Sequence, residues 1–377
     1  MPYSSNIRKK ISRHLVNIPG WCTSRKPIVF LSDDWGGVRV RSKEAREALI
    51  RAGLPMDRNR FDRFDCLESN GDLEGLFEVL LSHKDQNGNH PVITAVANVA
   101  NPDFEKIREG GFSEYHYEPF TETLKRYPEH NSVFELYQKG IALNVFRPEL
   151  HGREHLQVQW WLENLQSGHE AVRLAFEQGF WHLPGKYLTN PLHRGLAAAY
   201  DIASTEEVDP QKGIVADGAV LFNQIFGYNS ELFIPPAQHY NQSLEQAIAA
   251  AGFKMIDVPR LRKMPLGDGK FKIKLHFPGQ QNKSGLQYIT RNAVFEPNMN
   301  EHSDGVNECL ADIESAFCFK KPAIISNHRA AFTGGLDEKN QAKGLKALNR
   351  LLREILKRWP NAEFISAPRL FEIMNGK

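Results

Sequence analysis

Apolar residues follow two patterns along the chain, one typical of strands and one typical of helices. Apolar runs of strand length lie at residues 27–31, 92–99, 141–146, 232–236, 253–258, 287–295, 322–326 and 362–366. The segments between them include stretches with helical spacing, such as 72–83, where leucine and phenylalanine recur three and four positions apart. Strands that alternate with amphipathic helices predict a mainly parallel sheet. We therefore expect an α/β protein whose sheet closes into a barrel.

The first strand ends abruptly in two neighbouring carboxylates, within the stretch FLSDDWGG at residues 30–37. In parallel α/β folds the catalytic and ligand-binding residues lie at the carboxyl ends of the strands. Neighbouring side chains at a strand end point in different directions, so Asp33 and Asp34 are suited to different roles. One can bind a metal ion while the other moves a proton. The two glycines that follow allow a tight turn.

Two further segments supply imidazoles. His151 and His155, in the sequence HGREH, are four positions apart, which places both rings on one face of a helix or helical turn. That spacing suits one metal ion, and neutral imidazole nitrogen is a ligand for zinc, cobalt, nickel or iron. The strand at 322–326 runs into Asn327-His328-Arg329. If these groups all lie at carboxyl ends of strands, the fold brings them together at one metal site.

As a set, these motifs resemble those of the polysaccharide deacetylases with NodB homology, in the glycoside hydrolase/deacetylase superfamily. The family's first motif, a strand ending in Asp-Asp-x-Gly-like sequence, is matched by SDDWG at 32–36. Its second, His-x-x-x-His, is matched at 151–155, and its fifth, a strand ending in histidine, at 324–328. Its third, Arg-Pro-Pro-x-Gly, is matched in part by IPPAQ at 234–238. The resemblance spans residues 26–374 and implies a distorted seven-stranded (β/α) barrel with loop insertions.

The resemblance also implies roles for the site residues. Asp34, His151 and His155 would hold a divalent metal ion, with zinc expected and cobalt, nickel or iron as alternatives. Asp33 would be the general base that takes a proton from water. His328 would be the general acid that protonates the leaving amine, since an amine cannot leave as its anion.

Two features depart from the family pattern. Ile234 stands where the third motif has an arginine that steadies the catalytic aspartate. The fourth motif, an aspartate and a tryptophan that orient the histidine acid, has no clear match. We expect Arg153 or Arg329 to replace the missing arginine.

Several side chains near the motifs are candidates for substrate contact. Gln238, His239 and Asn241 follow a double proline and can either contact substrate or cap the next helix. Trp35 offers a flat face on which a sugar ring can stack, although an aromatic ring is more often part of a core. The substrate-binding set expected from the sequence is Trp35, Arg153, Gln238, His239 and Arg329, with Trp181, His182 and Tyr240 as further stacking faces.

Composition narrows the class of protein. The 377 residues are 41% hydrophobic and 24% charged, as in an ordinary soluble globular protein. A formal net charge of +2 gives no reason to expect nucleic acid or an anionic membrane as partner. Four widely spaced cysteines form no CxxC pair, and we find neither a signal-peptide core nor a membrane span. We therefore expect a cytoplasmic protein with one barrel domain at 26–377 and an N-terminal extension at 1–25 packed on it.

The expected reaction is metal-dependent hydrolysis of an N-acetyl group on an amino sugar or glycoconjugate, with a small substrate preferred to a polymer. One alternative is a metal-dependent amide hydrolase that acts on a non-sugar carbon–nitrogen bond. A second is a metallopeptidase, since 151–155 also has the pattern His-x-x-Glu-His, but Pro148 and Gly152 disfavour the uninterrupted helix it needs. A third is a non-catalytic carbohydrate-binding protein on an inactive barrel.

Overall fold

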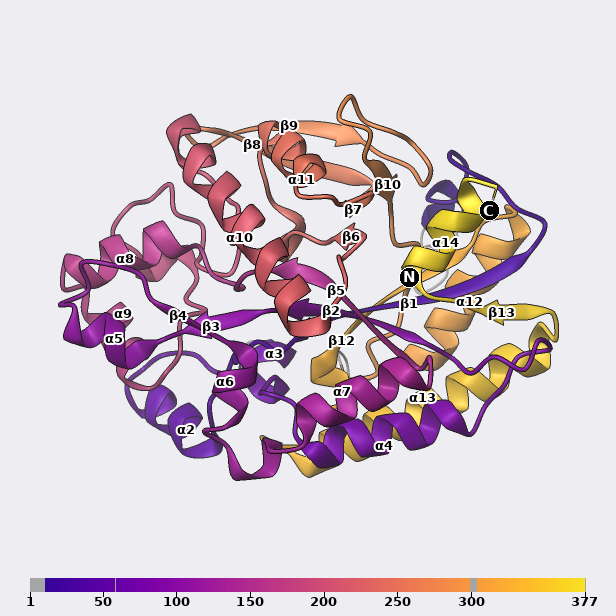
Figure 1. Ribbon diagram of the computed structural model, residues 1–377, viewed down its shortest axis with the longest axis horizontal. Coiled ribbons are helices and arrows are strands. Elements are labelled where there is room, and N and C mark those ends of the chain that lie inside the picture. The colour runs from indigo at the N-terminus through magenta and orange to yellow at the C-terminus, as the bar shows by residue number, and fades with distance from the viewer. Residues whose placement is uncertain (1–10, 58, 299–303, 377) are drawn as a thin grey trace, which may run out of the picture.

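A parallel sheet forms the centre of the fold (Figure 1). The computed structural model describes residues 11–57, 59–298 and 304–376, and these supply nine strands to the sheet. Eight follow the order β10-β7-β6-β5-β2-β1-β12-β11, and the ninth, β13, pairs with the start of β1. The strands are β1 (Lys26–Trp35), β2 (Ile93–Asn98), β5 (Phe146–Gly152), β6 (Leu232–Phe233), β7 (Met255–Asp257), β10 (Gln287–Ile289), β11 (Ala293–Val294), β12 (Ala323–His328) and β13 (Ala362–Phe364).

The sheet curls into an open barrel. Its two end strands, β10 and β11, are separated in sequence by only residues 290–292. Four Cα–Cα steps of 3.8 Å span at most about 15 Å, so the two ends of the sheet lie within that distance of each other. The predicted α/β class and distorted barrel are thus observed. Nine strands take part instead of seven, because the apolar run at 287–295 divides into two strands and the short β13 also pairs with β1.

Side chains of β1 alternate between two cores, as the pleat of a strand requires. Ile28 and Phe30 pack into the core shared with the surrounding helices. Val29 and Leu31 pack inside the curl, against apolar side chains from β2, β6, β7, β10 and β12. Both faces of the central strand are therefore buried, and apart from Lys26 at its start its polar residues, Ser32, Asp33 and Asp34, lie toward its carboxyl end.

Helices cover the outside of the sheet (Figure 1). Helix α4 (Asn70–Leu81) packs against both α7 (Val133–Ala142) and α13 (Glu338–Arg358), and α12 (Gly305–Cys318) packs against α13. The others are α2 (Lys43–Arg51), α3 (Arg60–Phe64), α5 (Phe104–Glu109), α6 (Phe120–Leu124), α8 (Val158–Gln166), α9 (Glu170–Glu177), α10 (Val208–Phe226), α11 (Glu245–Ala250) and α14 (Ala367–Met374). Over the described ranges, no helix combines the length and the apolar character needed to cross a bilayer.

Two antiparallel pairs lie outside the main sheet. One joins β3 (Ala100–Pro102) to β4 (Tyr117–Pro119), and the other is the hairpin of β8 (Leu261–Gly267) and β9 (Lys270–Leu275). The predicted strand at 141–146 is wrong: it comprises the end of α7 and a turn in which Asn144 has a φ of 54°. Strand β5 begins where that prediction ends.

The N-terminal segment contacts α12. Residues 11–15 are helical, Arg13 Nε donates to Asp312 Oδ1 at 2.6 Å, and Asn17 Nδ2 donates to Ser315 Oγ at 3.2 Å. The first ten residues of the predicted extension lie outside the described part of the chain. The division into an extension and one barrel domain remains a prediction.

Candidate metal centre and active-site cavity

A β-bulge at the end of β1 directs two neighbouring aspartates into one site. The pairing of β1 with β2 shifts register near the carboxyl end, and Asp34 there has a φ of 79°. Aspartate tolerates this left-handed conformation better than most residues. The bulge interrupts the alternation of the strand, so that Asp33 and Asp34 both reach the carboxyl edge. Gly36 completes the turn with a φ of 75°, where a Cβ would lie 2.5 Å from the carbonyl oxygen of Asn98.

Asp34, His151 and His155 form a group that can hold a metal ion. One ligand atom from each lies within 4.8 Å of the other two. Asp34 Oδ1 is 3.4 Å from His151 Nε2 and 3.5 Å from His155 Nε2. His151 Nδ1 lies 2.7 Å from the carbonyl oxygen of Ile234, which can only accept, so Nδ1 carries the proton and Nε2 keeps its lone pair. One carboxylate and two imidazoles fit a divalent ion with room for further ligands.

The protonation states of this group also suit a metal. Burial by itself raises the pKa of Asp34, but His151, His155 and His328 outweigh burial and hold that pKa well below its usual range. Burial lowers the pKa of His155 to about 4. At neutral pH the carboxylate is therefore ionised and the His155 ring neutral, which are the forms that bind a cation.

The two histidines do not lie on a helical turn, so that prediction is wrong. His151 is in β5 and His155 is in the bend that follows it, and their ring centroids are 5.0 Å apart. Glu154 between them is buried and forms a two-point ion pair with Arg153, at 2.6 and 3.0 Å. Because Glu154 is turned away and paired, it cannot serve as the base that the metallopeptidase alternative requires.

Arg291 takes the place beside Asp33 that was expected for Arg153 or Arg329. Its Nη1 and Nη2 donate to the two carboxylate oxygens of Asp33, at 2.7 and 2.9 Å. Its Nε donates to Asp257 Oδ2 at 2.7 Å, and Gln238 Nε2 donates to the same oxygen at 2.6 Å. Asp33 is thus held by a guanidinium that is itself fixed by a buried carboxylate.

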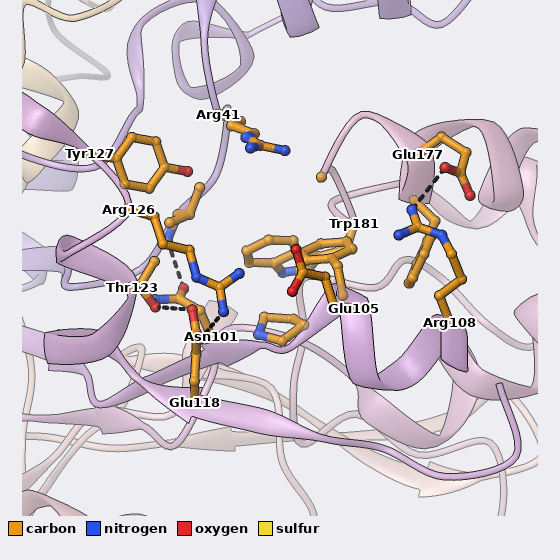
Figure 2. A pocket seen from close by; sticks show the side chains of 15 residues that line it. Arg41, Asn101, Glu105, Arg108, Glu118, Thr123, Arg126, Tyr127, Glu177 and Trp181 are labelled. Atoms are coloured by element: carbon orange, nitrogen blue, oxygen red, sulfur yellow. Dashed lines mark hydrogen bonds and ion pairs between the residues drawn. The ribbon is translucent and has the colours of Figure 1, made fainter. Parts of the chain in front are cut away.

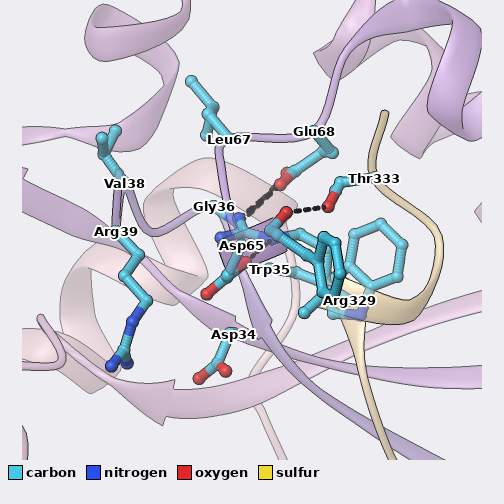
Figure 3. A network of polar contacts seen from close by, with 12 residues as sticks. Asp34, Trp35, Gly36, Val38, Arg39, Asp65, Leu67, Glu68, Arg329 and Thr333 are labelled. Carbon is cyan, nitrogen blue, oxygen red and sulfur yellow. Dashed lines mark hydrogen bonds and ion pairs between the residues drawn. The ribbon is translucent and has the colours of Figure 1, made fainter. Parts of the chain in front are cut away.

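Arg153 and Arg329 are both used elsewhere. Arg153 pairs with Glu154 and Asp217. The fully buried Arg329 pairs with two carboxylates, Asp65 at 2.8 Å and Glu68 at 2.6 Å (Figure 3). Since the donors of both guanidinium groups already face carboxylates, the prediction that either one steadies Asp33 is wrong. A substrate contact for either arginine stays a prediction.

His328 lies at the end of β12, next to Asp33. Its Nε2 is 3.7 Å from Asp33 Oδ2, and its Nδ1 is 2.5 Å from Glu296 Oε1. Burial lowers the pKa of His328, but Glu296 and Asp33 outweigh burial, so the pKa is raised above its usual value. Glu296 also pairs with Arg60 at 3.0 Å, which fixes the carboxylate in place. Glu296 therefore supplies the orienting carboxylate for which the sequence showed no match.

Trp35 does not face the site, so the prediction that it stacks on a sugar is wrong. Its side chain is 1% exposed, and Nε1 donates to Ser32 Oγ at 3.1 Å. The ring packs edge-on against Phe146 with centroids 5.0 Å apart. It belongs to the core beneath the site.

A cavity of about 640 Å³ adjoins the metal group. Arg39 and His182 line this cavity and also line the narrow space that contains Asp34 and His155. His239 lines the cavity, and its buried Nδ1 has no hydrogen-bond partner within the described residues. Burial and the charge of Arg39 hold the pKa of His182 well below its usual value, so this ring is neutral.

A second cavity, of about 130 Å³, is lined in part by Trp181 (Figure 2). Trp181 and Asn101 line both it and the narrow space beside Asp34. Its rim carries ion pairs, Arg126 with Glu118 and Arg108 with Glu177. Both cavities adjoin the narrow space beside Asp34, but the larger one, of about 640 Å³, has more room and is therefore the better candidate for substrate.

Sequence reasoning missed Arg291 and Glu296 as members of the site. Each follows a short strand, β10 or β11, and so stands at the same carboxyl edge as the predicted residues. The signal was a charged residue two positions after the end of a short strand. It was hidden because the whole segment 287–295 alternates like one continuous strand.

No protein-family model and no curated protein sequence matches this chain. Solved structures with a similar course of the chain include a Mycobacterium smegmatis protein classed as a polysaccharide deacetylase, with 10% identity and a TM-score of 0.47, covering 95% of this chain and 93% of that one. Another is a 4-alpha-glucanotransferase from Thermococcus litoralis, with 9% identity and a TM-score of 0.48, covering 92% of this chain and 40% of that one. A third is an allantoinase, with 9% identity and a TM-score of 0.45, covering 93% and 90%. At sequence identities this low, the similarity to these structures concerns the fold alone.

Proposed function

We propose that this protein is a metal-dependent hydrolase that removes an acetyl group from an N-acetylated sugar or glycoconjugate. The observation that carries the proposal is the position of Asp33, which lies between Arg291 and His328 beside the group formed by Asp34, His151 and His155. A carboxylate next to an imidazole with a raised pKa supplies a base and an acid at neighbouring positions. Hydrolysis of an amide needs both groups.

Each residue of this set has a distinct role in the proposed reaction. A divalent ion held by Asp34, His151 and His155, zinc in our proposal, would polarise the acetyl carbonyl and lower the pKa of water. Asp33 accepts the proton of the attacking water, and Arg291 fixes the direction of its carboxylate. His328 donates its Nε2 proton to the leaving nitrogen while Glu296 holds the ring through Nδ1.

The cavity beside the metal group is of a size that suits a sugar. Ligand sites commonly enclose about 300–1,000 Å³, and the cavity of about 640 Å³ falls within this range. His239 and Lys263 add polar groups to its wall. We propose a small acetylated substrate within the cytoplasm, in line with the sequence expectation.

The proposal is tested by following acetate and free amine together in zinc-loaded protein. The substrates are N-acetylglucosamine, its short oligomers, acetylated polymers, and an O-acetyl ester with a good leaving group. His328→Ala should lose more activity on the N-acetyl substrate than on the ester, because the ester needs the acid less. An equal loss on both, or no acetate from any acetylated sugar, would refute the proposal.

One observation favours a second candidate, a metal-dependent hydrolase of a non-sugar amide. The apolar wall of the larger cavity is mostly aliphatic, with Leu54, Met56 and Leu183, and among the described residues only Phe180 adds a Phe, Tyr or Trp ring to it. Sugar rings commonly stack on flat aromatic faces, and this wall offers few. Small linear and cyclic amides therefore belong in the same assay, and turnover of these alone would select this candidate.

A further inference from the structure

His182 stands between the metal group and the larger cavity. Its ring centroid lies 5.3 Å from that of His155. It lines both the narrow space with Asp34 and the cavity of about 640 Å³. His182 is therefore placed to contact a substrate that extends from this cavity to the metal group.

A hydrogen bond with Arg39 decides which nitrogen of His182 carries the proton. Arg39 Nη1 lies 3.2 Å from His182 Nδ1. A guanidinium has only N–H donors, so Nδ1 must accept with its lone pair. The proton of the neutral ring is therefore on Nε2. Within the described part of the chain, His182 Nε2–H thus has no hydrogen-bond partner. His151 differs, because its Nδ1 donates to a carbonyl oxygen and its Nε2 keeps a lone pair.

The arginine that sets this tautomer is itself fixed. Asp62 Oδ1 accepts from Arg39 Nε at 3.1 Å and from Nη2 at 2.7 Å, which leaves Nη1 for His182. Asn59 Nδ2 donates to the other oxygen of Asp62 at 2.6 Å, and Asn59 caps the start of α3. A chain of contacts from a helix terminus thus orients the His182 ring and its N–H.

We propose that His182 is a further catalytic residue, one that donates its Nε2 hydrogen to the carbonyl oxygen of the substrate amide. This rests on the proposed function. As the water oxygen bonds to the carbonyl carbon, the π electrons of the C=O bond move onto its oxygen, and the His182 N–H stabilises that charge. Asp33 takes the water proton. When the C–O double bond re-forms, the C–N bond breaks and His328 protonates the nitrogen, while His182 gives up no proton.

The proposed role of His182 differs from that of a metal ligand. A nitrogen that carries a proton has no lone pair for a cation, and the group that can hold the ion comprises Asp34, His151 and His155. Replacement of His182 should therefore leave the metal content unchanged. It should remove only an N–H donor that faces the carbonyl oxygen.

Paired substitutions test the N–H. His182→Leu removes the donor, His182→Gln keeps a side-chain N–H, and His276→Leu is the control for loss of a buried histidine at a distance, beside Tyr288. Loss of one such donor typically lowers kcat by about 10²–10³-fold. We therefore expect the kcat of His182→Leu to fall by that factor, with little change in KM. His182→Gln should recover part of the loss, and all three variants should bind as much zinc as the wild type.

Two readouts do not depend on turnover. Nitrogen NMR of histidine-labelled protein should show His182 protonated on Nε2 alone, and Arg39→Leu should abolish this preference. Acetate, the expected product, should bind zinc-loaded His182→Leu about tenfold more weakly than wild type, as expected for loss of a hydrogen bond to a charged group. A proton on Nδ1, unchanged acetate affinity, or loss of zinc in His182→Leu would each overturn the inference. If the wild type releases no acetate from any substrate, the proposed function fails, and these two readouts still decide the role of His182.

Discussion

Asp33 and His328 are paired residues of the neighbouring strands β1 and β12, and Asp33 Oδ2 lies 3.7 Å from His328 Nε2. Each is held from its other side by a group of opposite charge, Asp33 by Arg291 and His328 by Glu296. The sheet register therefore fixes the distance between the proposed base and acid. The two flanking partners fix their orientations.

The Arg291–Asp33 ion pair leads to a first prediction. Arg291→Lys should lower kcat by about 10²-fold, because a lysine cannot hold both oxygens of Asp33 in a planar fork and a small misplacement of a catalytic group is costly. Metal content should not change. Arg262→Lys is the control, since Arg262 is a buried arginine paired with Glu245 and does not touch Asp33. Equal effects of the two substitutions on kcat would contradict the positioning role of Arg291.

The Glu296–His328 contact leads to a prediction about pH. The general acid acts only when protonated, so the rate should fall as the pH rises through the raised pKa of His328. Glu296→Gln removes a negative charge that raises this pKa, so the falling limb of the pH–rate profile should move to lower pH. Glu363→Gln, which removes a carboxylate paired with Arg25 away from the site, should leave the limb in place. If the falling limb of the pH–rate profile of Glu296→Gln does not move, or moves to higher pH, the result would contradict the role of His328 as the general acid.

The buried position of Trp35 leads to a prediction about stability. Trp35→Ala should lower the free energy of unfolding by about 3–5 kcal/mol, because it removes a large side chain from a packed core. The KM for substrate should change little in protein that remains folded, since the ring does not reach the cavity. Chemical denaturation and steady-state kinetics measure the two effects. A large rise in KM without loss of stability would restore Trp35 as a substrate contact.

The sequence predicted the parts of the site that follow from strand ends. Asp33, Asp34 and His328 each close an apolar run, and parallel strands place their carboxyl ends at one edge, so their meeting could be foreseen. His151 was placed correctly beside Asp34 but for the wrong reason, because β5 runs through a segment expected to be a helical turn.

The partners of these residues could not be predicted, because they depend on how the sheet curls. Arg291 reaches Asp33 only because the two end strands of the sheet are brought within a few residues of each other. Arg153 and Arg329 have the same chemistry in the sequence, and only the structure shows that nearby carboxylates occupy them. For His182, the tautomer depends on Arg39, which is 143 positions away.

The most direct test of the central claim is the zinc content per chain, measured by elemental analysis after loading and removal of excess metal. Wild type and Asp33→Asn should each hold one ion, because Asp33 pairs with Arg291 and is not one of the proposed ligands. His151→Ala/His155→Ala should hold none. Absence of zinc from the wild type, or full retention by the double variant, would contradict the metal site on which the account rests.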